Sequence, residues 1–208
     1  MIPFPNKKYN IIYADPPWKY KTYSDRNVCP YPIMKDNEIY DLPIQSICEK
    51  DCVLFMWVTF PKLLEGIKTI EEWGFQYKAC AFTWVKKNKK ADSFFWGMGH
   101  WTRANAECCL LATIGKPKRI GKGVHQIIYE PIREHSRKPD CTRDRIVELC
   151  GDLPRIELFA REETDGWDYW GNETKKFTKD CIQKELMINK VPLPTSQLNF
   201  LEQYATAS

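Results

Sequence analysis

The chain has 208 residues and a formal net charge of +4, and 43% of its residues are hydrophobic. This length fits one domain with a full core, and the apolar content excludes a disordered chain. The N-terminus lacks a secretory signal, and no apolar run reaches the roughly 20 residues that a membrane-spanning helix needs. We therefore expect a soluble, cytoplasmic protein, whose mild positive charge suits an anionic partner without requiring one.

Short apolar runs alternate with amphipathic segments along the chain. Strands are predicted at residues 10–14, 52–58, 75–87, 106–115, 124–131 and 154–161. Helical turns broken by Pro43 are predicted within residues 34–51, and helices at residues 60–73 and 140–150, which Gly74 and Gly151 close. This alternation predicts a three-layer α/β/α fold with a mostly parallel, twisted sheet. A short basic turn joins the fourth and fifth strands, which predicts an antiparallel hairpin at one edge.

Long loops and a polar tail complete the chain. Aromatic and polar loops are predicted at residues 19–35 and 88–105, and a tryptophan-rich loop at 165–173. We expect one catalytic domain over residues 1–174. Residues 175–208 form a C-terminal extension with a predicted helix followed by an irregular end.

Nine cysteines raise the question of disulfide bonds or a metal site. An odd number without a secretory signal does not indicate a disulfide framework. Cys48 and Cys52 are spaced most like metal ligands, but no matching second pair or nearby histidine accompanies them. Several cysteines lie in apolar runs and are predicted to be small core residues, namely Cys52, Cys80, Cys108 and Cys150. We predict no metal site.

The stretch "NIIYADPPWKYKTYS" begins with a predicted strand and ends in polar residues. Asp15 falls at the carboxyl end of this strand, and Pro16 and Pro17 stop the strand and restrict the backbone. Ligands bind at that edge of open α/β sheets. Taken alone, the stretch fits equally well a capped strand with Trp18 as a cover over the core.

Several chemistries are excluded because their motifs are absent from the chain. There is no phosphate-binding glycine-rich loop with lysine, no Gly-x-Ser-x-Gly and no Gly-x-Gly-x-x-Gly after the first strand. Methylation of an exocyclic amino group does fit. Such an amine is a poor nucleophile, because its lone pair is conjugated into the ring. The carboxylate of Asp15 and the carbonyl of Pro16 can accept its N–H groups, Trp18 can stack on the base, and two prolines keep the acceptors rigid.

The run Asp-Pro-Pro-Trp at residues 15–18 resembles the catalytic motif of adenine amino-methyltransferases that use S-adenosylmethionine. Within these, the chain resembles the family of the catalytic subunit of the eukaryotic messenger-RNA m6A writer. Similar segments follow in the family's order at residues 53–61, 97–115, 135–140, 155–161 and 166–173. The resemblance covers most of residues 9–173 and implies a Rossmann-like fold with a permuted motif order. "FAR" and "WGNE" resemble the bacterial and phage branch, which is generally assigned to DNA.

The resemblance also implies roles for individual residues. Asp15 would contact the target amine and lie near the methionine part of S-adenosylmethionine, and Lys138 would bind its carboxylate. Arg161, Asn172 and Glu173 would lie at the ribose. The full cofactor set is Ala14, Asp15, Lys138, Leu158, Phe159, Arg161, Asn172 and Glu173. The resemblance does not assign the residues that bind the adenine of the cofactor. The family's segment before the catalytic motif is short or missing in this sequence, and a His-Asn pair of the eukaryotic branch is absent.

Lys19, Tyr31, His100, Trp101 and Arg103 are the predicted substrate-binding residues. The lysines at 86–90 are candidates for phosphate contacts, although a solvated turn explains them as well. Surface alternatives remain for Lys138, Glu173 and Tyr31. Trp57, Trp73 and Trp84 are predicted core residues.

The sequence thus predicts an enzyme that methylates adenine at its 6-amino group, with DNA favoured over RNA as its partner. RNA with the same chemistry, and a non-catalytic nucleic-acid-binding subunit, are the alternatives. Cytosine is less favoured, because related cytosine enzymes more often carry serine in place of Asp15. A monomer, a homodimer and a complex with a second subunit all remain open.

Overall fold

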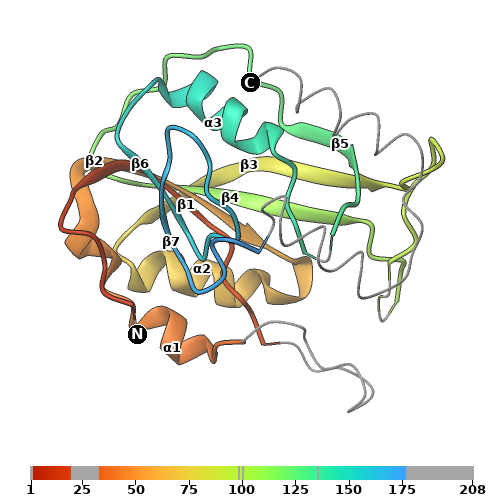
Figure 1. The fold of residues 1–208 in the computed structure, drawn as a ribbon, viewed down its shortest axis with the longest axis horizontal. Helices are drawn as coiled ribbons and strands as arrows, with labels where there is room; N and C mark the ends of the chain where they lie inside the picture. The colour runs from red at the N-terminus through yellow and green to blue at the C-terminus, as the bar shows by residue number, and fades with distance from the viewer. Residues whose placement is uncertain (1, 20–32, 98, 100, 135, 177–208) are drawn as a thin grey trace.

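The computed structural model describes residues 2–19, 33–97, 99, 101–134 and 136–176. Seven strands form one sheet in the order β5-β3-β4-β2-β1-β6-β7 (Figure 1). The strands are β1 (Tyr9–Ala14), β2 (Cys48–Val58), β3 (Gln76–Lys87), β4 (Ala106–Ile114), β5 (Ile127–Pro131), β6 (Arg155–Leu158) and β7 (Asp168–Trp170). The helices are α1 (Asp36–Tyr40), α2 (Leu63–Glu72) and α3 (Cys141–Cys150), with 3-10 turns at Ile44–Ile47 and Phe60–Lys62.

Six strands of this sheet share one direction, and β4 runs opposite to them. β1 pairs in parallel with β2 and β6, and the pairs β6–β7 and β3–β5 are also parallel. β4 pairs antiparallel with both β2 and β3. The prediction of a Rossmann-like α/β fold with a mostly parallel sheet is confirmed.

The antiparallel hairpin predicted between residues 106–115 and 124–131 is wrong. β2 bonds to one edge of β4 and β3 to the other, so neither edge is open to β5. β5 therefore pairs with the far side of β3, in parallel. The connection from β4 to β5 passes the C-terminal end of α3, where the backbone N–H of Ile120 donates to the carbonyl of Leu149 at 2.8 Å.

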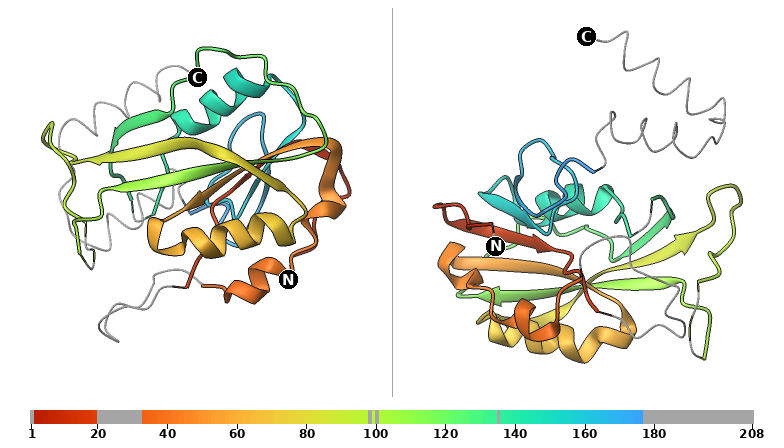
Figure 2. Two further views of the ribbon diagram at one scale, coloured as in Figure 1. Left: turned by 180° about the vertical axis from the view of Figure 1, so that it is seen from behind. Right: turned by 60° about the horizontal axis from the view of Figure 1, so that its bottom comes forward.

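Helices cover both faces of the sheet, with α1 and α2 on one side and α3 on the other (Figures 1 and 2). In β1, Ile12 belongs to the apolar cluster under α1 and α2, whereas Ile11 and Tyr13 belong to the cluster under α3. Burial on both faces explains why this strand is a continuous apolar run instead of an alternating one. Among the described residues, no helix is long and apolar enough to span a bilayer.

The predicted core tryptophans are confirmed. Trp57 and Trp73 are 1% exposed and Trp84 is 3% exposed. Trp73 also joins two elements, because its Nε1 donates to the carbonyl of Ile39 in α1 at 2.8 Å. Gly74 ends α2 with a φ of 78°, a conformation that favours glycine, as predicted.

The path of the chain through the sheet determines where a ligand can bind. After β1 the chain builds the half of the sheet from β2 outward to β5, and it then returns to place β6 on the other side of β1. The strand order reverses between β2 and β6, with β1 at the centre. In open α/β sheets the crevice beyond the carboxyl ends of the strands at such a reversal holds the ligand.

We expect Leu54→Ala in β2 to lower the free energy of unfolding by about 2–5 kcal/mol, because Leu54 is 0% exposed and its loss leaves a cavity. Leu64→Ala is the matched control, since Leu64 in α2 is 82% exposed and should change stability by less than about 0.5 kcal/mol. Urea denaturation of both variants measures the difference. Equal losses would contradict the described core.

Candidate active site

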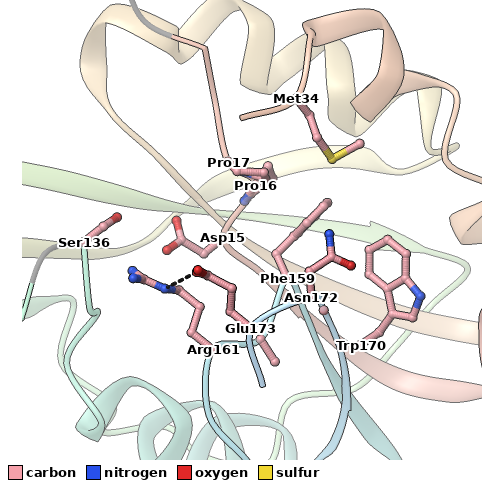
Figure 3. Close-up of a pocket in the computed structure, with 12 residues that line it drawn as sticks. Asp15, Pro16, Pro17, Met34, Ser136, Phe159, Arg161, Trp170, Asn172 and Glu173 are labelled. Carbon is pink, nitrogen blue, oxygen red and sulfur yellow. Dashed lines mark ion pairs between the residues drawn. The ribbon is translucent and has the colours of Figure 1, made fainter. Parts of the chain in front are cut away.

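A cavity opens at the carboxyl ends of β1 and β6 (Figure 3). The space inside it, with its open mouth included, is about 680 Å³. It is lined by Asp15, Pro16, Pro17, Met34, Ser136, Phe159, Ala160, Arg161, Trp170, Gly171, Asn172 and Glu173. A smaller cavity shares part of this wall and extends it to Lys138. Residues that are far apart in the sequence therefore surround two cavities that share part of their wall.

The larger cavity has an apolar part and a polar part. Met34, Phe159 and Trp170 form the apolar part, with the rings of Phe159 and Trp170 edge to face at 5.5 Å between centroids. Asp15 and Arg161 lie across from them in Figure 3. A ligand with a flat apolar portion and charged groups at its other end matches this division.

Two residues at the cavity have strained backbones. Ser136 has a φ of 61° and Phe159 a φ of 60°, and they are the non-glycine residues with positive φ within the described ranges. Residues with a Cβ are disfavoured in this conformation, because that atom approaches the backbone carbonyl oxygen, and such residues concentrate at functional sites. Both line the larger cavity. Gly171 permits the close approach of β6, since a Cβ there would lie 2.5 Å from the carbonyl oxygen of Ala160.

Asp15 follows β1 directly, so the sheet determines its position. Burial raises the pKa of its carboxyl group, while the nearby ammonium of Lys138 lowers it, and the pKa stays above the ordinary value of 3.8. The next two carbonyls already accept hydrogen bonds. Pro16 accepts from the N–H of Trp18 at 2.8 Å, and Pro17 accepts from the N–H of Met34 at 3.1 Å. These two bonds hold both ends of the segment between Trp18 and Met34 beside Asp15.

Lys138 connects three parts of the fold. Its Nζ lies 2.8 Å from Oδ2 of Asp15 at the end of β1 and 3.3 Å from Oε2 of Glu107 in β4. Lys86 pairs with the other oxygen of Glu107 at 2.5 Å. Burial raises the pKa of Glu107, but Lys138 and Lys86 outweigh it and hold that pKa below its usual value.

Glu107 is a site residue that the sequence analysis did not assign. Its signal was a single acid inside the apolar run "AECCLLATIG", since a buried charge requires a partner. Lys86 also differs from expectation. It is mostly buried against Glu107 and the ring of Trp84 instead of facing solvent for a phosphate.

Arg161 and Glu173, which both line the cavity, form an ion pair. Nε of Arg161 lies 3.3 Å from Oε2 of Glu173, shown by the dashed line in Figure 3, and Lys176 pairs with the other oxygen at 2.8 Å. Asn172 lines the same cavity, and in Figure 3 its side chain lies beside those of Phe159 and Trp170. The three residues expected at a ribose therefore all line the cavity, where a carboxylate and an amide can accept from hydroxyl groups.

Arg133 holds the backbone of Lys138 in place. Its guanidinium donates to both oxygens of Asp140, at 2.6 and 2.7 Å, and to the carbonyl of Lys138 at 2.7 Å. In α3, the guanidinium of Arg143 donates two hydrogen bonds to the carboxylate of Glu157 in β6, at 2.6 and 3.1 Å. Planar two-point pairs of this kind are directional, so they orient the segment before α3 relative to β6.

Three predicted site residues lie away from the cavity. Trp18 is 3% exposed, belongs to the core under α1 and α2, and donates to the carbonyl of Trp57 at 3.3 Å. It does not line either cavity, and its position matches the cover over the core. Its stacking role stays a prediction. Ala14 and Leu158 are fully buried strand residues whose side chains pack into the same core. A strand end exposes the residue after it, which is Asp15 for β1 and Phe159 for β6.

The predicted substrate residues divide into two groups. Tyr31 and His100 lie outside the described residues. Lys19 is exposed just after Trp18, and Trp101 and Arg103 are exposed in the β3–β4 connection. None of these three lines the cavity. Their roles stay predictions.

We expect Asp15→Asn to increase the free energy of unfolding near neutral pH. Above its folded-state pKa the buried carboxylate is ionised and disfavours folding, because folding removes its water. Below the ordinary value of 3.8 it is protonated in both folded and unfolded chains, so this cost vanishes. The gain in unfolding free energy over wild type should therefore shrink as the pH falls from the folded-state pKa to the ordinary value of 3.8. Urea denaturation at a series of pH values measures this gain. Asp165→Asn on the surface is the control for the loss of an exposed carboxylate. A gain in stability that does not depend on pH would contradict the raised pKa of Asp15.

Comparison with known proteins adds to the geometry. The model of the MT-A70 family matches residues 9–173, which include all 12 residues around the larger cavity. The Type II methyltransferase M.MunI of Mycoplasma sp is 34% identical over 213 residues, covering 92% of this chain and 83% of M.MunI.

Eukaryotic proteins are also similar. The N(6)-adenosine-methyltransferase catalytic subunit METTL3 of Homo sapiens is 30% identical over 170 residues, covering 80% of this chain and 28% of METTL3. The N(6)-adenosine-methyltransferase MT-A70-like of Arabidopsis thaliana is 30% identical over 169 residues, covering 79% of this chain and 24% of that protein. This chain spans about a quarter of both eukaryotic relatives but most of M.MunI.

Proposed function

The chain is an adenine methyltransferase of the MT-A70 family, and we propose that it transfers the methyl group of S-adenosylmethionine to the 6-amino nitrogen of adenine in DNA. The observation that carries the proposal is the convergence of Asp15, Lys138, Arg161, Asn172 and Glu173 on two joined cavities at the reversal of strand order. Asp15 lies near the start of the chain, and the other four follow in its second half, so the fold brings the two groups together.

The donor set fits the cofactor group by group. Asp15 suits the ammonium of the methionine part, and Lys138 suits its carboxylate. Asn172 and Glu173 are acceptors for the ribose hydroxyls. Phe159, Trp170 and Met34 provide an apolar surface for the adenine ring. When bound, S-adenosylmethionine supplies an electrophilic methyl group on a sulfonium.

Asp15 orients the nucleophile in this proposal. Its carboxylate accepts a hydrogen bond from the target amine, and burial strengthens it as an acceptor by raising its pKa. The carbonyl of Pro16 keeps one lone pair beyond its bond with Trp18 and is the second acceptor. Both acceptors are held by the strand end and two prolines, so little reorganisation accompanies the reaction.

DNA is favoured because M.MunI is matched over most of its length, whereas the eukaryotic adenosine methyltransferases are matched over about a quarter of theirs. RNA remains the second candidate, because both nucleic acids present the same base edge once the target is unpaired.

Wild-type protein should form 6-methyladenine, and Asp15→Asn should reduce the rate by at least about a hundredfold through loss of the oriented acceptor. The assay supplies labelled S-adenosylmethionine with duplex DNA, single-stranded DNA, duplex RNA or single-stranded RNA, and nucleoside mass spectrometry identifies the product. Asp165→Asn, an exposed acid outside the cavity wall, should retain full activity. Cofactor binding without methylation of any substrate would refute the proposal, and a product confined to RNA would correct its substrate.

Lys138→Met should weaken binding of S-adenosylmethionine by about 5- to 150-fold, the effect of losing a charge-assisted contact of about 1–3 kcal/mol. Isothermal calorimetry measures the affinity without any methyl transfer. Lys118→Met is the control, because Lys118 is exposed in the connection between β4 and β5. Equal affinities of the Lys138 variant and wild type would mean that the carboxylate binds elsewhere.

A further inference from the structure

Four large aromatic side chains are exposed on the β3–β4 connection and on β5. Phe94 is 55% exposed, Trp96 74%, Trp101 99% and Tyr129 42%. Phe94 and Tyr129 meet edge to face with 6.0 Å between ring centroids. The connection projects beyond the rest of the sheet in Figure 2. Exposed aromatic clusters of this kind mark interaction surfaces, because leaving large rings in water is unfavourable.

The backbone that presents these rings is closely held. The N–H of Asn88 donates to Ser93 at 2.9 Å, and the N–H of Phe95 donates to Lys86 at 2.8 Å. Gly97 permits the return of the chain, since a Cβ there would lie 1.9 Å from the carbonyl oxygen of Ala104. The backbone that carries Phe94 and leads into Trp96 is therefore held in a defined arrangement, which lowers the ordering cost of binding there.

Cations lie on the same rings. The guanidinium of Arg103 lies 5.6 Å from the ring centroid of Trp96, and Nζ of Lys87 lies 4.8 Å from that of Tyr129. The acid Asp92 is paired with Lys87 at 2.7 Å, and Glu130 is the other acid beside these residues. Lys89 and Lys90 add two more exposed cations at the turn of the connection.

The location links these rings to the catalytic residues. The connection ends at Asn105, whose carbonyl accepts from the N–H of Lys86 at 2.8 Å. Two residues later, Glu107 contacts Lys138, which contacts Asp15. A strand bound along the connection would thus run toward the cavity mouth.

We propose that Phe94, Trp96, Trp101 and Tyr129, with Arg103 and Lys87, form a stacking platform for unpaired bases that flank the target adenine. This inference rests on the proposed function and specifies its substrate as a single-stranded stretch of nucleic acid. Bases stack on aromatic rings whatever their sequence, and cations between the rings neutralise the phosphates. A protein partner fits less well, because lysines are depleted from the buried centres of protein interfaces.

The double variant Trp96→Ala/Trp101→Ala should weaken binding of a labelled single-stranded oligonucleotide by at least about tenfold, measured by fluorescence anisotropy. Replacing both tryptophans by tyrosine should restore most of the affinity, because a flat ring remains. Arg103→Met should reduce the slope of log affinity against log salt by about 0.7, the value for one phosphate contact on a single strand. Tyr77→Ala, at the other end of β3 and 43% exposed, is the matched control and should bind like wild type.

Binding is measured without methyl transfer, so this test and that of the proposed function fail separately. Wild-type protein that methylates only fully paired duplex, or a double variant that binds single strands normally, would overturn the platform and leave the methyltransferase intact. Binding of single strands that depends on the platform, without methylation of any substrate, would overturn the methyltransferase and leave the platform intact. A double variant that changes the oligomeric state in light scattering, but not the affinity for single strands, would show a protein interface and overturn the proposal.

Discussion

The ion pairs of Lys138 with Asp15 and Glu107 are the interaction on which the site depends. They join the end of β1, the start of β4 and the segment before α3, three places far apart in the sequence. A buried carboxylate without a partner is costly, and Lys138 offsets this cost for Asp15 and, together with Lys86, for Glu107. Arg133 in turn binds the backbone of Lys138, which makes the position of the cation a property of the fold.

The sheet supplies the other constraint. Because β6 returns to the free edge of β1, the residues after β6 lie against the residue after β1. Phe159 turns the chain there with a strained backbone, which the surrounding structure sustains through the pairing of β6 with β7 and the bonds between Arg143 and Glu157. The stability of the sheet is thus used to hold a local geometry that the segment would not adopt alone.

The proposed chemistry and the proposed substrate contacts come from different halves of the sheet. The cavity lies at the carboxyl ends of β1 and β6, whereas the stacking platform lies at the β3–β4 connection and β5. Glu107 is the link, because it follows the connection directly and contacts Lys138. In this arrangement the connection can vary with the substrate while the strand ends that carry Asp15 and Phe159 stay unchanged.

The sequence by itself determined the strands other than β7, the helices, the core tryptophans and the identity of most cavity residues, because burial on both faces and strand-end polar residues leave local patterns such as "NIIYADPP". The loop predicted at residues 165–173 contains the strand β7 instead. It did not determine which strands pair, because both edges of β4 are occupied by β2 and β3. It also did not reveal β7, which is too short to show a hydrophobic period. It also did not determine where Trp18 packs or that Glu107 pairs with Lys138. These contacts join residues far apart in the chain, and competition for strand edges and charged partners is decided only when the whole sheet assembles.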